Sequence, residues 1–201
     1  MEKADQCIAP HFRRWDVPPA DEDEPSDRSL SPELIAPLSL FSSLLSTIVQ
    51  SFPPATRTTL YRRIAALVSQ ALYDRLLAAH GWTETAAHQF QYDLDHGFLV
   101  AAREAGMPER GLQRGWEVAR GGGIILTLPA QASQQGGYVP GGELTFSKVM
   151  SVVFDDDSSV RSTDDDEDTP FGAIMSELGI GEALTRSEVQ QLMRRRPECW
   201  R

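Results

Sequence analysis

Apolar residues recur at steps of three and four over most of the middle of this chain, and this spacing constrains the fold more than any other feature. Such steps return to the same side of an α-helix, so they predict amphipathic helices that bury one face. The first of these stripes consists of Leu34, Leu38, Phe41, Leu45, Ile48 and Phe52. Nothing alternates with a period of two for long enough to form a strand. The spacing therefore predicts an all-α protein.

Prolines mark the limits of the first two predicted helices. Ser31 is a candidate N-cap with Pro32 at the first helical position, and Pro53 and Pro54 end this helix and begin the next, which should run to about His80. The second helix has a broad apolar face, expected to bury Leu60, Tyr61, Ile64, Leu67, Val68, Ala71, Leu72 and Leu76. A face this broad implies contacts with helices on two sides.

Thr83 is the predicted N-cap of a third helix, Glu84 to about Ala105. Its stripe is Ala87, Phe90, Leu94, Phe98, Ala101 and Ala105. A fourth helix is predicted over Leu112 to Leu128, although each glycine of Gly121 to Gly123 costs it roughly 1 kcal/mol relative to Ala. These glycines indicate either a kink or close packing against a neighbouring helix.

Two shorter helical stretches complete the pattern. One is predicted around Glu143 to Phe154, and the other is a helical pair over Phe171 to Trp200. In the pair, Thr185 and Glu188 have the spacing of a capping box, and Gly179 and Gly181 supply a permissive turn. Helix, turn and capped helix are therefore expected.

Acidic residues are concentrated in two segments. Residues 16–27 hold six acids and no base, residues 155–168 have a local charge of −7, and the whole chain of 201 residues has a net charge of −10. The remainder is nearly balanced. We expect a disordered acidic tail over 1–28, a helical bundle over 29–154, a disordered acidic loop over 155–169 and a C-terminal helical pair over 170–201 that packs on the bundle.

Several functional classes lack their sequence signals. The N-terminus has no apolar run of a signal peptide, and Leu34 to Phe52, the segment closest to a membrane span, is interrupted by Pro37 and Gln50. Cys7 and Cys199 lie far apart without metal-ligand spacing. The three arginines 194–196 form one short cluster, which does not support nucleic-acid binding.

The candidate chemical sites all have simpler explanations. His80, His88 and His96 are spaced by eight, whereas a metal pair on a helix is expected at a spacing of four. Asp93 and Asp95 are expected on the outer face of an amphipathic helix. The acidic loop lacks the Gly and Glu of an EF-hand, although Ser162 and Thr163 are candidate phosphorylation sites. No catalytic, metal or cofactor residues are predicted.

Four segments, in order, resemble the RINT-one/Tip-twenty family of vesicle-tethering subunits. They are SPELIAPL (31–38), AAHQFQYDLDHGFLVAAREAG (86–106), WEVARGGGIILTLP (116–129) and LGIGEALTRSEVQQLMRRRPECW (178–200). Their order and spacing carry the resemblance, which covers most of residues 30–200. The acidic loop and the triple glycine depart from the family pattern but leave the helical stripes intact.

The resemblance implies a fold and a function. The fold would be a stacked antiparallel helical bundle of the CATCHR tether type, C-terminal portion only, because family members are much longer. The function would be that of a non-enzymatic subunit of the Dsl/NRZ complex, which receives COPI vesicles in Golgi-to-ER retrograde transport. Its partners would be ER SNAREs and other tether-complex subunits. They would hold it peripherally at the cytoplasmic face of the endoplasmic reticulum, without direct membrane insertion.

Two other classes stay open from the residues themselves. A stand-alone helical adaptor that binds a partner helix in a groove is the main alternative. A cofactor-free hydrolase is less well supported, because no nucleophile with a positioned base is visible.

Limited proteolysis tests the predicted organisation. The first cuts should fall within residues 1–28 and 155–168, because their acids repel one another and their apolar content is low. Mass spectrometry of the early fragments would identify the cut sites. Initial cleavage inside residues 35–128, or protection of 155–168, would contradict this division.

Overall fold

The computed structural model describes residues 29–79, 81–130, 144–154 and 170–200, and every regular element within these ranges is helical. The all-α prediction is confirmed for this part of the chain. The acidic segments 1–28 and 155–169 lie outside the described residues.

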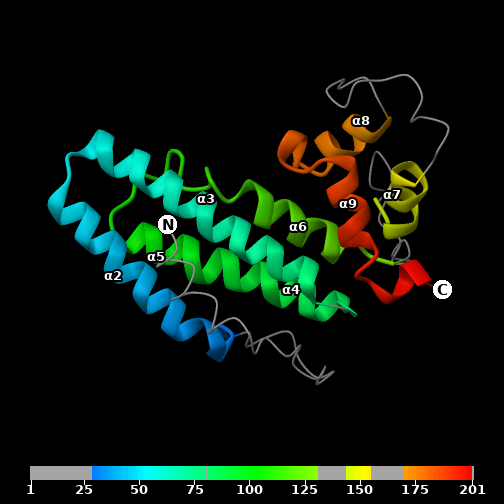
Figure 1. Ribbon diagram of the computed structural model, residues 1–201, viewed down its shortest axis with the longest axis horizontal. Helices are drawn as coiled ribbons and strands as arrows, with labels where there is room; N and C mark the ends of the chain where they lie inside the picture. Colours follow the sequence, from blue (N-terminus) through cyan, green and yellow to red (C-terminus); the bar gives the residue numbers. More distant parts are fainter. Residues whose placement is uncertain (1–28, 80, 131–143, 155–169, 201) are drawn as a thin grey trace, which may run out of the picture.

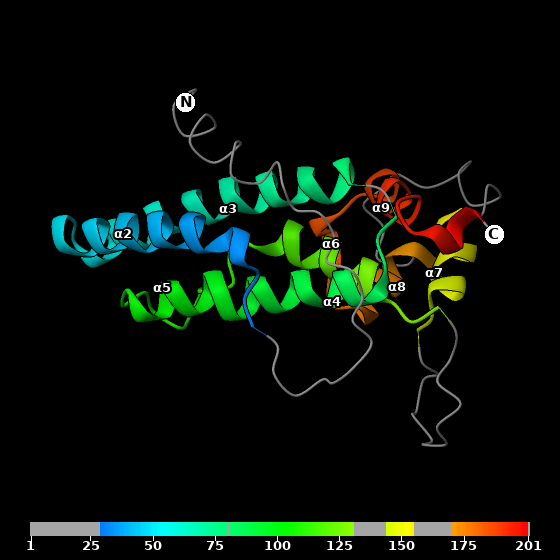
Figure 2. The same ribbon diagram turned by 90° about the horizontal axis from the view of Figure 1, so that it is seen from below.

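An antiparallel hairpin occupies one end of the structure. It consists of α2 (Ile35–Ser51) and α3 (Pro54–Ala78), preceded by the short 3-10 helix η2 (Pro32–Leu34). Figures 1 and 2 show α2 lying along α3 and α5, which it contacts. The buried Phe41 of α2 packs edge-on against Phe98 and Trp116, with ring centroids 5.4 and 6.0 Å away. The prolines end and begin the helices as predicted.

The buried face of α3 is narrower than predicted. Ala65, Leu72 and Leu76 define its centre and are at most 1% exposed, whereas Leu67 is 62% exposed. Leu60 and Ile64 are partly buried at the edge of the core. The prediction that Leu67 is buried is therefore wrong, because α3 has core contacts over part of its circumference only.

The third predicted helix is continuous but contains a π-helical segment. It comprises α4 (Glu84–Asp93), the π-helix η3 (Leu94–Leu99) and α5 (Val100–Glu104). The Thr83 side chain accepts a hydrogen bond from the amide of Ala86, which confirms the predicted N-cap. Because a π-turn adds a residue, the buried face shifts, and Leu99 at the end of the π-helix and Ala102 after it are buried.

Asp93, where the π-helix begins, is fully buried. Its carboxylate accepts hydrogen bonds from the Ser31 amide at 3.0 Å, the Ser31 hydroxyl at 2.6 Å and the Gln89 side chain at 3.0 Å. The prediction that Asp93 lies on the outer face is wrong, because Ser31, distant in sequence, supplies donors that permit burial. Ser31 consequently does not cap η2 with its side chain. Asp95 is exposed as predicted.

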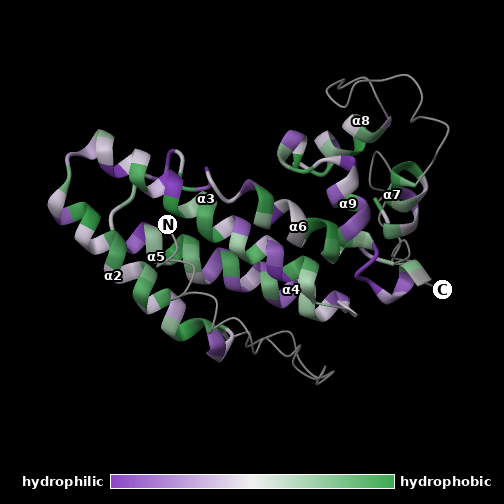
Figure 3. Cartoon of the chain, in the orientation of Figure 1, coloured by the Kyte–Doolittle hydropathy of each residue, from purple (hydrophilic) through white to green (hydrophobic). Residues whose placement is uncertain are grey.

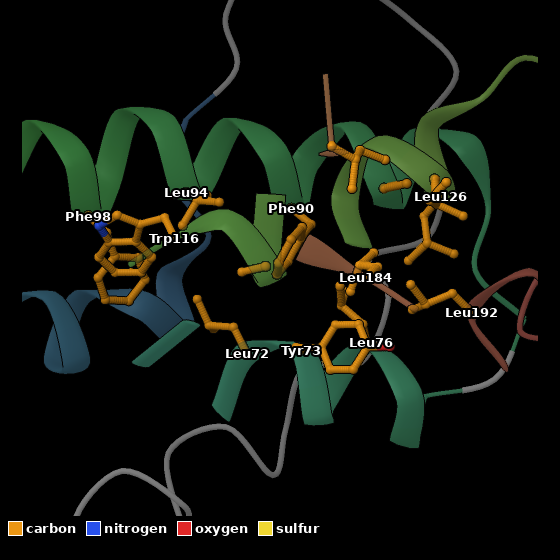
Figure 4. Packing of buried hydrophobic residues seen from close by; sticks show 14 of the residues in the cluster. Leu72, Tyr73, Leu76, Phe90, Leu94, Phe98, Trp116, Leu126, Leu184 and Leu192 are labelled. Atoms are coloured by element: carbon orange, nitrogen blue, oxygen red, sulfur yellow. The ribbon is translucent and has the colours of Figure 1, made fainter. Parts of the chain in front are cut away.

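The glycine-rich helix α6 (Glu117–Thr127) runs without a break and contacts α3, α4, α9 and η5. A Cβ added to Gly122 would lie 2.8 Å from Leu76 and 3.2 Å from Tyr73, and one added to Gly123 would lie 3.0 Å from Gln91. Figure 4 shows Tyr73, Leu76 and Phe90 in this core. The glycines therefore serve close packing rather than a kink. The helix begins at Glu117, later than the predicted Leu112.

Other elements satisfy both ends of α6. The Ser69 hydroxyl of α3 accepts a hydrogen bond from the amide of Ala119 at 3.0 Å. The buried guanidinium of Arg196 donates to the carbonyls of Leu126, at 3.0 Å, and Leu128. It also stacks over the Phe146 ring at 4.5 Å. The end groups of a helix, which have no partner within it, are thus bonded from α3 and from the C-terminal segment.

The remaining elements form a C-terminal group around α9. They are α7 (Phe146–Val153), α8 (Pro170–Glu177), the 3-10 helix η5 (Gly181–Ala183), α9 (Arg186–Met193) and the 3-10 helix η6 (Pro197–Trp200). The capping box of Thr185 and Glu188 is present as predicted. The Arg186 and Gln190 side chains donate to the last carbonyls of α7, and the Arg195 carbonyl accepts from the amides of Gly81 and Trp82. Hydrogen bonds therefore join α9 to α7, and the residues after α9 to the turn before α4.

Replacement of Gly122 by Ala should destabilise the protein by about 1 kcal/mol, because overpacking against the buried Leu76 and Tyr73 outweighs the gain in helix propensity. Gly123→Ala is the matched control. Its nearest neighbour is the flexible, partly exposed Gln91 at 3.0 Å, and the buried Phe90 ring lies farther away at 3.3 Å, so the gain in helix propensity should offset the milder crowding and the free energy of unfolding should change by less than about 0.5 kcal/mol. Urea denaturation measures both, and equal effects of the two substitutions would contradict close packing at Gly122.

Stability should depend on pH through Asp93. Burial raises the pKa of this carboxyl above its ordinary value, against the opposing effect of its three hydrogen bonds. A carboxyl whose pKa is higher in the folded state than in the unfolded state contributes most to stability below its unfolded pKa, about 3.9. That contribution is lost as pH rises through the folded-state pKa. The free energy of unfolding of the wild type, relative to Asp93→Asn, should therefore fall as pH rises from about 3.5 to about 7. Thermal unfolding across that range measures the difference, and a constant or rising difference would show that the hydrogen bonds dominate.

Candidate protein-interaction surface

The histidines considered as metal ligands have surface contacts. His88 pairs with Glu84 at 3.8 Å, and His96 stacks on Tyr92 with ring centroids 4.3 Å apart. His80 lies outside the described residues. Within the described ranges, no group of three or more His, Cys, Asp and Glu residues could hold a metal ion. The structure thus does not bring the predicted candidates together as a site.

Polar residues that line a surface cleft form hydrogen bonds with neighbouring residues. This cleft, of about 470 Å³, lies between α6 and the turn at Leu178 to Ile180. Its Arg120 donates to Gln113 at 2.9 Å, and its Glu117 accepts from the amide of Gly115 at 2.6 Å. These groups form no nucleophile and base pair. Elsewhere, burial raises the pKa of the Cys199 thiol, which disfavours the nucleophilic thiolate.

Large apolar side chains nevertheless remain exposed on the hairpin. They are Ile35, Leu40, Leu44, Phe52 and Leu67. Single exposed apolar residues are common on soluble proteins, whereas neighbouring ones mark interaction surfaces. Their relative positions therefore decide whether they form a site.

Two of them are neighbours on α2, and a third lies on α3. Leu38, on one flank of α2, faces Gly97 of η3, where an added Cβ would lie 3.1 Å from it. Leu40 and Leu44 are one turn apart on the opposite flank of α2. Leu67 lies at the same height on α3, since Leu40 and Leu67 are about equally far from the Pro53–Pro54 turn. We call Leu40, Leu44 and Leu67 the outer α2–α3 face.

Of the two helices that supply this face, α2 carries no charge, whereas Arg63 lies one turn before Leu67 on α3. No Asp, Glu, Lys or Arg occurs between Glu33 and Arg57, and Figure 3 draws α2 mostly in green and pale colours. Pro32–Ser51 is long and apolar enough to cross a membrane by composition, but the core helix of a soluble protein passes the same test. Its buried residues Phe41, Leu45 and Ile48 belong to the core. Exposed apolar side chains on two antiparallel helices can bind a third helix through apolar contacts.

Sequence reasoning missed this face. The helical stripes identify core positions, and they place Leu67 in the core for that reason. The charge-free run from Leu34 to Thr56 is the signal that could have identified the face, because an exposed helix face normally carries charged residues.

Comparison with known proteins gives one family assignment. The model of the RINT-1/TIP-1 family matches residues 1–196. No curated protein and no solved structure matches the chain. The family match extends over nearly the whole sequence and agrees with the resemblance of the four segments, so the chain belongs to the RINT-1/TIP-1 family.

Proposed function

We propose that this chain is a non-enzymatic subunit of a vesicle-tethering complex at the endoplasmic reticulum and that it acts in Golgi-to-ER retrograde transport. Membership of the RINT-1/TIP-1 family supports the role in tethering. The observation that carries the proposal is the outer α2–α3 face, because a tether subunit works by binding other proteins and this face exposes apolar side chains on a packed bundle.

The partner that suits this face is an amphipathic helix. Leu40 and Leu67 are 53% and 62% exposed on the two helices of the hairpin, and one partner helix lying across both is proposed to cover them. Because α2 is uncharged from Ile35 to Ser51, the contacting side of the partner must be apolar or small and uncharged. Helices of ER SNAREs and of neighbouring tether subunits are the proposed occupants.

Attachment to the membrane is proposed to be peripheral. The inner side of α2 packs in the core through Phe41, Leu45 and Ile48, and insertion of this helix into a bilayer would remove these contacts. The chain would therefore reach the cytoplasmic face of the endoplasmic reticulum through its partners.

Charged substitutions on the outer α2–α3 face should abolish partner binding while the fold survives. The double variant Leu40→Asp and Leu67→Asp should reduce recovery of SNAREs and tether subunits by at least about tenfold, because the partner would bury two unpaired carboxylates. Co-precipitation of the full-length gene product from cells, followed by an assay of Golgi cargo retrieval, measures both effects.

Ile35→Asp is the matched control, since Ile35 is 65% exposed but lies on the other flank of α2. All three positions are exposed, so thermal unfolding should change little in either variant. Deletion from Phe171 onward is a poorer test, because it also removes the Arg196 hydrogen bonds to α6.

Normal retrieval without the protein, together with no recovery of tether or SNARE partners by the intact chain, would contradict tethering. Recovery of unrelated helical partners alone would favour an adaptor.

A further inference from the structure

The contact between Ser31 and Asp93 joins two parts of the chain that are 62 residues apart. Ser31 is 7% exposed, and its hydroxyl donates to Oδ2 of Asp93 at 2.6 Å while its amide donates to Oδ1 at 3.0 Å. The contact holds the entry of α2 against the point where α4 becomes the π-helix. It has no part in the outer α2–α3 face or in any chemistry described above.

Ser31 is followed directly by Pro32, and its backbone is extended, with φ −57° and ψ 126°. An extended serine before proline is the substrate pattern of proline-directed protein kinases. Ser29, two residues earlier, is exposed but precedes Leu30. The sequence therefore distinguishes Ser31 from its neighbour as a substrate.

We propose that Ser31 is a phosphorylation site for a proline-directed kinase and that its contact with Asp93 is a latch that the phosphoryl group opens. In the reaction, a bond forms between the Ser31 oxygen and the γ-phosphorus of ATP, and the bond from that phosphorus to the β,γ-bridging oxygen breaks. ADP leaves, and the hydroxyl proton passes to a base of the kinase. The proposal concerns this chain alone and does not rest on the tethering function.

A phosphate at this position is incompatible with the contact. Phosphoserine has a charge of about −1.5 to −2 and no hydroxyl proton to donate, so it would place two anions together in a buried site. The neighbouring charge that acts on Asp93 is Glu33, which is another acid. The carboxylates of Asp93 and Glu33 would therefore repel a phosphate on Ser31, and the hydrogen bond from the Ser31 hydroxyl would be lost.

The opening should be limited to the entry of α2. Leu34 of η2 is buried, and so is Pro37, the third residue of α2, which has no amide to bond the preceding turn. Beyond it, Phe41, Leu45 and Ile48 are buried and hold the rest of α2 in place. We therefore expect residues 31–37 to detach while the hairpin remains.

The first test is phosphorylation itself. A proline-directed kinase that is active on a synthetic peptide of residues 25–38 is incubated with the full chain and ATP, and the site is located by mass spectrometry. We expect phosphate at Ser31 and none at Ser29, with the wild-type chain reacting more slowly than the peptide because the hydroxyl is buried. Asp93→Ala, which removes the acceptor, should accelerate the reaction. Absence of phosphate at Ser31 in both the wild type and Asp93→Ala would overturn the proposal.

The second test measures the latch through hydrogen exchange of the amides of Leu34 and Ile35, which donate to the carbonyls of Ser31 and Pro32. Ser31→Glu should raise their exchange by about tenfold relative to Ser31→Ala, since local opening frees these amides. Ser29→Glu adds the same charge at an exposed position and should leave exchange unchanged. In the Asp93→Asn background, the effect of Ser31→Glu should fall below about threefold, because the like charge is gone. Equal exchange in Ser31→Glu and Ser31→Ala, or an effect that persists undiminished in the Asp93→Asn background, would overturn the latch.

Discussion

The close approach of α6 to α3 and α4 is the constraint on which the rest of the bundle depends. Gly122 and Gly123 have no side chain to separate the helices, so Leu76, Tyr73 and Phe90 reach the α6 backbone. This lets one short helix contact α3, α4, α9 and η5. The intrinsic preference of glycine against helix costs roughly 1 kcal/mol at each position, and burial of the surrounding side chains offsets it.

The helix α6 has little stability of its own. Backbone amides and carbonyls at its ends form hydrogen bonds with residues distant in sequence. Ser69 accepts an amide near its start, and Arg196 donates to carbonyls near its end. The same arrangement recurs at α7, whose last carbonyls accept from Arg186 and Gln190. Side chains of the C-terminal segment therefore do for two helices what local capping residues do for α4 and α9.

The difference between local and distant hydrogen-bond partners explains which features could be predicted from the sequence. The caps at Thr83 and at Thr185 with Glu188 are local, so spacing alone located them. Asp93 and Arg196 were beyond such reasoning, because the groups that permit their burial, Ser31 and the carbonyls of Leu126 and Leu128, are distant in sequence. The prediction that Leu67 is buried was wrong for a related reason. Periodicity shows which side of a helix is apolar, but it does not show how much of that side is covered by neighbouring helices. The charge-free run along α2 is visible in the sequence, yet only the packing of α2 on one side shows that Leu40 and Leu44 remain exposed.

The Arg196 contact also orders events during synthesis. Leu126 and Arg196 are 70 residues apart, so at roughly 5 to 20 residues per second the carbonyl end of α6 waits several seconds for its donor. The helices from α2 to α5 can associate during that interval, whereas α6 can be completed only after α7 and α9 have been made. Until Arg196 has been made, the carbonyls of Leu126 and Leu128 can be bonded only by water, so the end of α6 is among the last parts of the fold to be fixed.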